Sequence, residues 1–297
     1  MAITYGFKKL IAEVAASGND KELFRRHRAS VTKRLTQTFR AHSVMPIGSY
    51  VRGTTLHRTS DLDLMLILRT NETRWGDYQK SSTRVLNKVR SQLQGRFTAT
   101  PVVRDGQAVV VRFGDRQHPV DVVPAFFRGL VDKRPVYMIP DGEGDWMATS
   151  PPAHNGYLKR ANKRSGGKLN NVIKLIKYWR ARRQTPVPIN SFHLEMLLAE
   201  MDICVGAKSY AQCVHNAFGL LAARKCRAMR DPLEISGLIE AANSESKRLI
   251  CEQAAETAAD RTHRALAAEE KGRDKEAARL WSLVFKTRSP KFLGSVK

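Results

Sequence analysis

An alternation of acidic and apolar residues constrains this chain more than any other feature. Asp61 and Asp63 flank Leu62 and lead into an apolar run at 64–68. Side chains of an extended strand point alternately to opposite faces, so the two aspartates would share one face and Leu62 would lie on the other. Two carboxylates held this close repel each other unless divalent cations lie between them. The pattern therefore predicts a buried strand that begins in a two-metal phosphoryl-transfer centre.

A glycine and a serine shortly before this strand have the chemistry of a phosphate-binding loop. Gly48 lets the backbone approach a ligand closely, and Ser49 offers a hydroxyl and an amide hydrogen to phosphate oxygens. A tight turn followed by a strand with two solvated aspartates would give the same residues a purely structural role. The order of the two motifs, directly before an apolar strand, favours the catalytic interpretation.

A third carboxylate is needed to complete such a metal site and to take the proton from the attacking hydroxyl. Segments 108–113 and 119–124 are rich in valine and are separated by polar residues at 114–117, which predicts a hairpin. Asp121 lies among these valines, where a charge is unfavourable unless a cation compensates it. We therefore predict Asp121 as the third ligand, the alternative being an edge strand that exposes it to water. Acids in turn-like stretches are weaker candidates: Asp105, Asp115 and Asp132.

These motifs resemble the nucleotidyltransferase superfamily of DNA polymerase β. The resemblance is carried by GSYVRGTTLHRTSDLDLML at 48–66 and VDVVPAF at 120–126. Within the superfamily the chain is most similar to the bacterial cGAS/DncV-like nucleotidyltransferases, which make cyclic oligonucleotide signals in anti-phage defence. Softer similarities at 137–151 and 174–195 extend it over most of the chain. The resemblance implies an α+β fold, with a mixed sheet flanked by helices in a polymerase-β-like core packed on a carboxy-terminal helical domain.

The resemblance also implies nucleotide-binding residues in the second half of the chain. Lys177 would contact the triphosphate, Ser191 would lie beside it, and Phe192 would stack on a nucleobase. Lys174 lies three residues before Lys177, so both could reach the same phosphates from one helix face. Solvated lysines and a core phenylalanine are the alternatives. Two Mg²⁺ ions, for which Mn²⁺ could substitute, are the implied cofactors, held by Asp61, Asp63 and Asp121.

The function hypothesis is a nucleotidyltransferase that joins NTPs into a cyclic or short linear oligonucleotide second messenger and releases pyrophosphate. ATP, GTP, UTP and CTP all remain open as substrates. One alternative is a template-independent RNA-end nucleotidyltransferase of the poly(A)- or CCA-adding kind. Another is a catalytically idle relative that binds nucleic acid or a partner, although the three aspartates together argue against it.

The excess of basic over acidic residues indicates which partners the chain could bind. The chain has 51 basic and 28 acidic residues and a net charge of +23, and no acid occurs between Arg25 and Arg58. Such an excess attracts polyanions in a salt-dependent way. It indicates either a nucleic-acid-binding surface or a solvated basic face that maintains solubility.

The positions of proline and glycine residues, which interrupt helices and strands, suggest two domains. We expect a catalytic domain at 1–155, with an amino-terminal helical region at about 7–42, and a helical nucleotide-holding domain at 156–297. Helices are predicted near 77–94, at 170–183, from a Ser191 cap to 201, and as a hairpin over 236–285 broken at Gly272. Long apolar stretches are lacking and the four cysteines have no metal-site spacing, so we expect a cytoplasmic protein, a monomer with no membrane partner.

Overall fold

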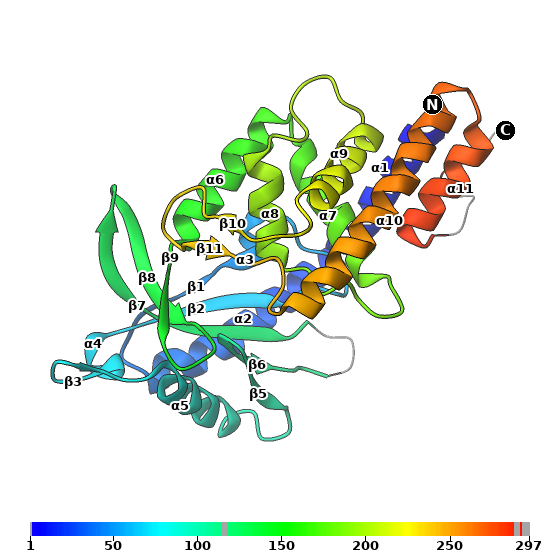
Figure 1. Cartoon of the computed structure of the whole chain (residues 1–297). Helices are drawn as coiled ribbons and strands as arrows, with labels where there is room; N and C mark the ends of the chain where they lie inside the picture. The colour runs from blue at the N-terminus through cyan, green and yellow to red at the C-terminus, as the bar shows by residue number, and fades with distance from the viewer. Residues whose placement is uncertain (1, 115–117, 288–291, 293–297) are drawn as a thin grey trace. The chain divides into compact units, whose positions relative to one another are not determined.

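The computed structural model describes residues 2–114, 118–287 and 292 (Figure 1). The chain forms two compact units. The first, named the sheet unit, consists of Ala16–Gly156 and Leu233–Gly237. The second, named the helical unit, consists of Met1–Ala15, Tyr157–Pro232 and Leu238–Lys297, as far as these are described.

A seven-stranded mixed sheet forms the centre of the sheet unit. Its main path runs in the order β1, β2, β7, β6, β5, and β8 pairs with both β7 and β9. β2 and β7 are parallel, whereas the other neighbouring strands are antiparallel. The strands are β1 (Ala41–Pro46), β2 (Leu62–Leu68), β5 (Val102–Asp105), β6 (Ala108–Val111), β7 (Val120–Val131), β8 (Arg134–Pro140) and β9 (Trp146–Thr149).

Two helices, α2 (Gly18–Thr38) and α5 (Ser82–Gln94), cover one face of this sheet (Figure 1). Leu62, Leu64 and Leu66 all lie in the core that these helices form with β6 and β7. Met65, which has the opposite parity, lies in a separate apolar cluster. The predicted alternation along β2 is therefore confirmed, and it places Asp63 on the face opposite the two helices.

Short elements connect the strands, and one of them occupies residues that were predicted to be helical. They are α3 (Gly48–Arg52), α4 (Thr70–Thr73), β3 (Arg74–Trp75) and β4 (Tyr78–Gln79). The helix expected at 77–94 begins only at Ser82, because Tyr78 and Gln79 pair with β3 and the Ser81 side chain caps the helix. The predicted pairing of 108–113 with 119–124 is confirmed by β6 and β7. Residues 115–117 of the predicted turn, with Asp115, lie outside the described residues.

The helical unit contains most of the remaining helices and one small ribbon. The ribbon pairs β10 (Met229–Arg230) with β11 (Leu238–Ile239). α10 and α11 pack closely against each other and confirm the hairpin predicted over this stretch. The helices are α1 (Ala2–Val14), α6 (Pro151–Arg164, which begins at the end of the sheet unit), α7 (Lys168–Ala181), α8 (Ser191–Glu200), α9 (Tyr210–Ala223), α10 (Glu245–Glu270) and α11 (Asp274–Phe285).

The first helix differs from expectation in both extent and packing. Two helices replace the single region predicted at about 7–42, because Ser17 begins α2 with a capping box in which its side chain and that of Asp20 bond each other's backbone N–H. α1 packs against α7, α9 and α11, where the Phe7 ring meets Trp281 and Phe285 edge-on. Residues 2–15 therefore pack with the helices of the helical unit.

Asn190, and not Ser191, caps α8. Its side-chain oxygen accepts a hydrogen bond from Phe192 N at 2.8 Å. Ser191 is instead the first residue of the helix. Among the described helices, none combines the length and apolar character required to cross a membrane.

Candidate active site

The three predicted aspartates come from two neighbouring parallel strands of the sheet unit. Asp63 lies on β2 directly opposite Asp121 on β7, and Asp61 comes just before β2 begins. Asp61 is exposed, whereas Asp63 and Asp121 are partly buried. Because β2 and β7 run in the same direction, the carboxylates gather near the amino-terminal ends of both strands.

Asp121 is in an electrostatically unfavourable environment. Burial, followed by the nearby charges of Asp61 and Asp63, raises the pKa of Asp121 to about 8. Its Oδ1 atom is buried and has no hydrogen-bond partner among the residues that the structure describes. A buried carboxylate oxygen without a donor is rare, because such a group loses its hydration without compensation. The environment of Asp121 is therefore suited to a bound cation.

Gly48 lies directly against the Asp63 carboxylate. Its φ of +67° is in the left-handed region, and a Cβ added to it would lie 1.8 Å from Asp63 Oδ2. Ile47, the residue before it, donates its backbone N–H to Asp63 O at 2.9 Å. Glycine is thus required here both by backbone conformation and by space.

Ser49 follows in the first turn of α3 and is almost fully buried. Gly53 ends this helix in a left-handed conformation, and the backbone N–H of Thr54 donates to Ser49 O at 3.0 Å. The segment 48–54 is therefore compact and internally bonded. The structure brings Gly48, Ser49 and the aspartates together.

Asp61, Asp63 and Asp121 form an acidic cluster whose chemistry suits a divalent cation, but their side chains are not arranged as a complete set of metal ligands. Across the described ranges, no three histidine, cysteine, aspartate or glutamate side chains already lie close enough to hold a metal ion. The cluster nevertheless supplies only hard oxygen donors, one of them buried and unpartnered, which is what Mg²⁺ or Mn²⁺ requires. Among the weaker candidates, Asp105 adds to the field at Asp121, and Asp132 lies in the β7–β8 turn.

The other predicted residues lie in the helical unit, on α7 and α8. Lys177 is buried, and its Nζ lies 3.2 Å from Oε1 of the fully buried Glu195. Ser191 Oγ accepts a hydrogen bond from Arg180 Nη1 at 2.8 Å. Lys177 and Ser191 thus lie on two packed helices and are both held by ionic side chains. Their role in nucleotide binding, like that of Phe192, stays a prediction.

Comparison with protein families assigns the chain. Residues 1–162, more than half of its 297 residues, match the Second Messenger Oligonucleotide or Dinucleotide Synthetase (SMODS) domain. This chain belongs to the SMODS family. The predicted identification as a cGAS/DncV-like nucleotidyltransferase, an enzyme class that makes cyclic oligonucleotides, is therefore confirmed.

Individual relatives of this SMODS chain agree with the assignment. A probable cyclic nucleotide synthase of Bacillus cereus (strain VD146) is 24% identical over 86% of this chain and 84% of its own length. A cyclic AMP-AMP-AMP synthase of Escherichia coli (strain MS 115-1) is 25% identical over 64% of this chain and 59% of its own length. The solved structure of E. coli MS115-1 CdnC with ATP superposes with a TM-score of 0.73 at 20% identity, covering 99% of this chain and 100% of that one. The last comparison confirms the predicted fold class.

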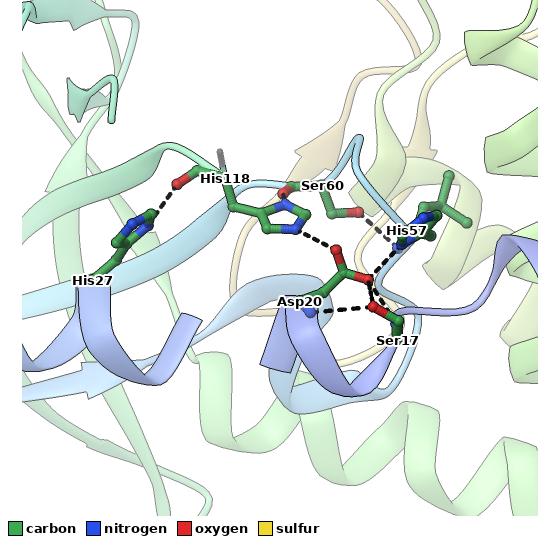
Figure 2. A network of polar contacts seen from close by, with 7 residues as sticks. Ser17, Asp20, His27, His57, Ser60 and His118 are labelled. Carbon is green, nitrogen blue, oxygen red and sulfur yellow. Dashed lines mark hydrogen bonds and ion pairs between the residues drawn. The ribbon is translucent and has the colours of Figure 1, made fainter. Parts of the chain in front are cut away.

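One polar network of the SMODS domain has no counterpart among the features predicted from the sequence. Figure 2 shows the carboxylate of Asp20 between the rings of His118 and His57, with Ser60 and Ser17 beside them. His118 Nε2 lies 2.8 Å from Asp20 Oδ1, and His118 Nδ1 lies 2.7 Å from the backbone oxygen of Ser60. The spacing of Ser17 and Asp20 is the one signal that could have identified part of it, as a helix cap.

Proposed function

We propose that this SMODS protein is a metal-dependent synthase that joins NTPs into a cyclic or short linear oligonucleotide second messenger and releases pyrophosphate. Its biological setting would be bacterial anti-phage signalling. The 3′- or 2′-hydroxyl of one nucleotide would attack the α-phosphorus of another, and the bond from that phosphorus to the bridging oxygen would break. Repetition of this step would close a ring.

The chain's own residues have distinct roles in this proposal. Asp61, Asp63 and Asp121 would hold two divalent cations, Mg²⁺ or Mn²⁺. When bound, such ions neutralise phosphate charge and lower the pKa of a coordinated hydroxyl. Asp121 would accept the proton of the attacking hydroxyl.

The remaining groups bind and orient the nucleotide. Gly48 leaves room for the Asp63 carboxylate, and Ser49 would donate to phosphate oxygens. Lys177 and Ser191 are proposed to contact the triphosphate and Phe192 the base. Catalysis would then depend on positioning and electrostatics, without a protein nucleophile.

The observation that carries the proposal is the pairing of Asp63 with Asp121 across parallel strands, with a buried Asp121 oxygen to which no group in the described part of the chain donates a hydrogen bond. A purely structural pair of aspartates would be solvated or hydrogen-bonded. Instead, Asp121 is buried among like charges, and cation binding would relieve that repulsion.

ATP is the first substrate to test. Two relatives are cyclic AMP-AMP-AMP synthases, one 25% and the other 30% identical, although this chain spans only 59% and 44% of their lengths. Purified protein should be incubated with each labelled NTP, with mixtures and with Mg²⁺ or Mn²⁺, then treated with phosphatase. Phosphatase-resistant oligonucleotides identified by mass spectrometry are expected. Failure of every NTP combination with either ion would reject the proposal.

A second candidate function is that of an RNA-end nucleotidyltransferase. The net charge of +23 supports it, because an excess of positive charge favours binding of an RNA primer. The same incubation with added RNA separates the two functions. Extension of RNA ends, with no product from NTPs alone, would identify an RNA-end nucleotidyltransferase.

A further inference from the structure

A single buried histidine joins the segments that lead into both acidic strands. His118 is 2% exposed and lies three residues before Asp121, just ahead of β7. Its Nδ1 faces the carbonyl oxygen of Ser60, the residue directly before Asp61. The ring therefore bridges the approach to β2 and the approach to β7 (Figure 2).

Both ring nitrogens of His118 face oxygen atoms. Ser60 O is a carbonyl oxygen and can only accept, so Nδ1 donates to it. Nε2 faces Asp20 Oδ1 at 2.8 Å. Although burial opposes it, hydrogen bonds from His57, Ser17 and His118 hold the pKa of Asp20 well below its usual range, so this carboxyl is ionised. The buried ring of His118 thus joins the buried Asp20 carboxylate to the backbone directly before Asp61.

Asp20 is itself rigidly held in the first turn of α2. Its Oδ2 accepts from Ser17 N and Oγ and from His57 Nδ1, each at 2.6 Å. The backbone of His118 is held as well, because its carbonyl oxygen lies 3.0 Å from Nδ1 of His27, one of the buried residues of α2. Helix α2 therefore anchors His118 at its side chain and at its backbone.

The two anchored segments also bond to each other. Leu62 N donates to Pro119 O at 3.0 Å, one step before the pairing of Asp63 with Asp121. Ser60 Oγ accepts from Leu56 N at 2.8 Å, which fixes the turn that precedes Asp61. A shift of His118 would move Pro119 and Ser60 together and so disturb the alignment of the acidic residues.

We propose that His118, oriented by Asp20, is a positioning residue that fixes the register of β2 against β7 and thereby places Asp61 and Asp63 opposite Asp121. The proposal rests on the proposed function for its effect on catalysis, but its structural part does not. Outer groups that orient metal-binding side chains usually change metal affinity or activity by about 10- to 100-fold when they are replaced.

The test compares His118→Gln with two controls. His57→Gln removes a donor from the same carboxylate but leaves the Ser60–His118–Asp20 connection intact. Val89→Ala removes buried volume from α5 in the same core and lowers stability without touching the network. Asp20→Asn keeps the side-chain volume and replaces His118→Gln if that variant does not fold.

Hydrogen exchange measured by mass spectrometry gives the first readout, and it needs no substrate. We expect His118→Gln to accelerate exchange at Leu62 and Val120 while α5 stays protected, whereas Val89→Ala should accelerate exchange in α5. The second readout is the Mg²⁺ concentration for half-maximal product formation. It should rise about 10-fold or more in His118→Gln and stay near the wild-type value in both controls.

The outcomes separate this proposal from the proposed function. Unchanged exchange at Leu62 and Val120 in His118→Gln would overturn the positioning role, as would a loss of activity no larger than that of Val89→Ala. If the wild-type protein makes no product but His118→Gln still accelerates exchange at Leu62 and Val120, the proposed function is rejected. The role of His118 in fixing the register of β2 against β7 is then upheld.

Discussion

Gly48 is closer to the Asp63 carboxylate than any side chain would allow. Replacement by alanine would put a methyl group 1.8 Å from Asp63 Oδ2, so the carboxylate must move. Displacement of a reacting group by about 1 Å can reduce a rate about 100-fold. We therefore expect Gly48→Ala to lower product formation from labelled NTPs by about 100-fold or more.

Gly76→Ala is the matched control for this prediction. Gly76 also has a positive φ, +56°, but a Cβ there would meet nothing within 4 Å. Both variants carry the strain of alanine in a left-handed conformation, which is about 1 kcal/mol. Equal activity of the two variants would show that contact with Asp63 is unimportant.

His193 on α8 predicts a pH dependence of stability. Burial and the charge of Arg224, opposed by a hydrogen bond to the Arg227 carbonyl, lower the pKa of His193 from 6.5 to about 4. The unfolded chain therefore binds the proton more readily between these values, so the free energy of unfolding falls as the pH drops from about 6.5 towards 4. The loss reaches about 3 kcal/mol at most.

Urea unfolding across this pH range tests the prediction. His193→Leu removes the titrating group, so the fall of the unfolding free energy should become shallower than in the wild type. His42→Gln, which replaces an exposed histidine of β1, should leave the slope unchanged. The same slope in all three proteins would refute the assignment.

At the scale of elements, α1 is predicted to be a structural part of the helical unit. Phe7 is fully buried, with its ring centroid 4.9 Å from that of Trp281 and 6.1 Å from that of Phe285. Truncation of such a phenylalanine costs about 3–5 kcal/mol. Phe7→Ala should therefore destabilise the protein by that amount and accelerate hydrogen exchange in α11.

Tyr5→Ala on the same helix provides the comparison. Tyr5 is 56% exposed, and a surface substitution of this kind changes stability by about 0.5 kcal/mol or less. If chemical denaturation shows Phe7→Ala to be no more destabilising than Tyr5→Ala, the packing of α1 is not as described.

Local patterns predicted the elements that hold the acidic site. The period-two alternation of Leu62, Leu64 and Leu66 was sufficient to orient β2, because one face of that strand must be buried. Asp121 was recognisable because a charge among valines needs compensation. Both inferences depend on residues close together in the sequence.

Other features depend on contacts between distant residues and were not predictable in the same way. Phe7 pairs with residues more than 270 positions away, so no local signal assigns α1 to the helical unit. The link between Asp20 and His118 spans 98 positions. Asn190 and Ser191 are both good caps, and only the helix geometry selects Asn190.

At the scale of the whole molecule, the net charge of +23 predicts salt-dependent binding of polyanions. Arg25, Arg26 and Arg28 are exposed along α2. If the basic residues bind single-stranded RNA, affinity should fall by about 10³ or more between about 50 and 200 mM salt. Fluorescence anisotropy with labelled RNA measures this dependence.

A charge-matched pair of triple variants completes the experiment. Replacing the three α2 arginines with glutamine should weaken binding more than the same change at three exposed basic residues of the helical unit, Arg264, Arg273 and Lys275. If no RNA binding is measured at about 50 mM salt, the basic residues form a solvated face and do not bind RNA.

The function proposed for this protein depends on a catalytic centre formed jointly by Asp61, Asp63 and Asp121. Its most direct test is product formation from labelled NTPs by Asp121→Asn, with Asp105→Asn as the control, because Asp105 is exposed and only adds to the field at Asp121. Asp121→Asn should remain folded, since it keeps the side-chain volume and removes a group whose ionisation is unfavourable there. Folded Asp121→Asn is expected to make no product, whereas Asp105→Asn is expected to remain active. Wild-type activity in a folded Asp121→Asn protein would contradict this expectation.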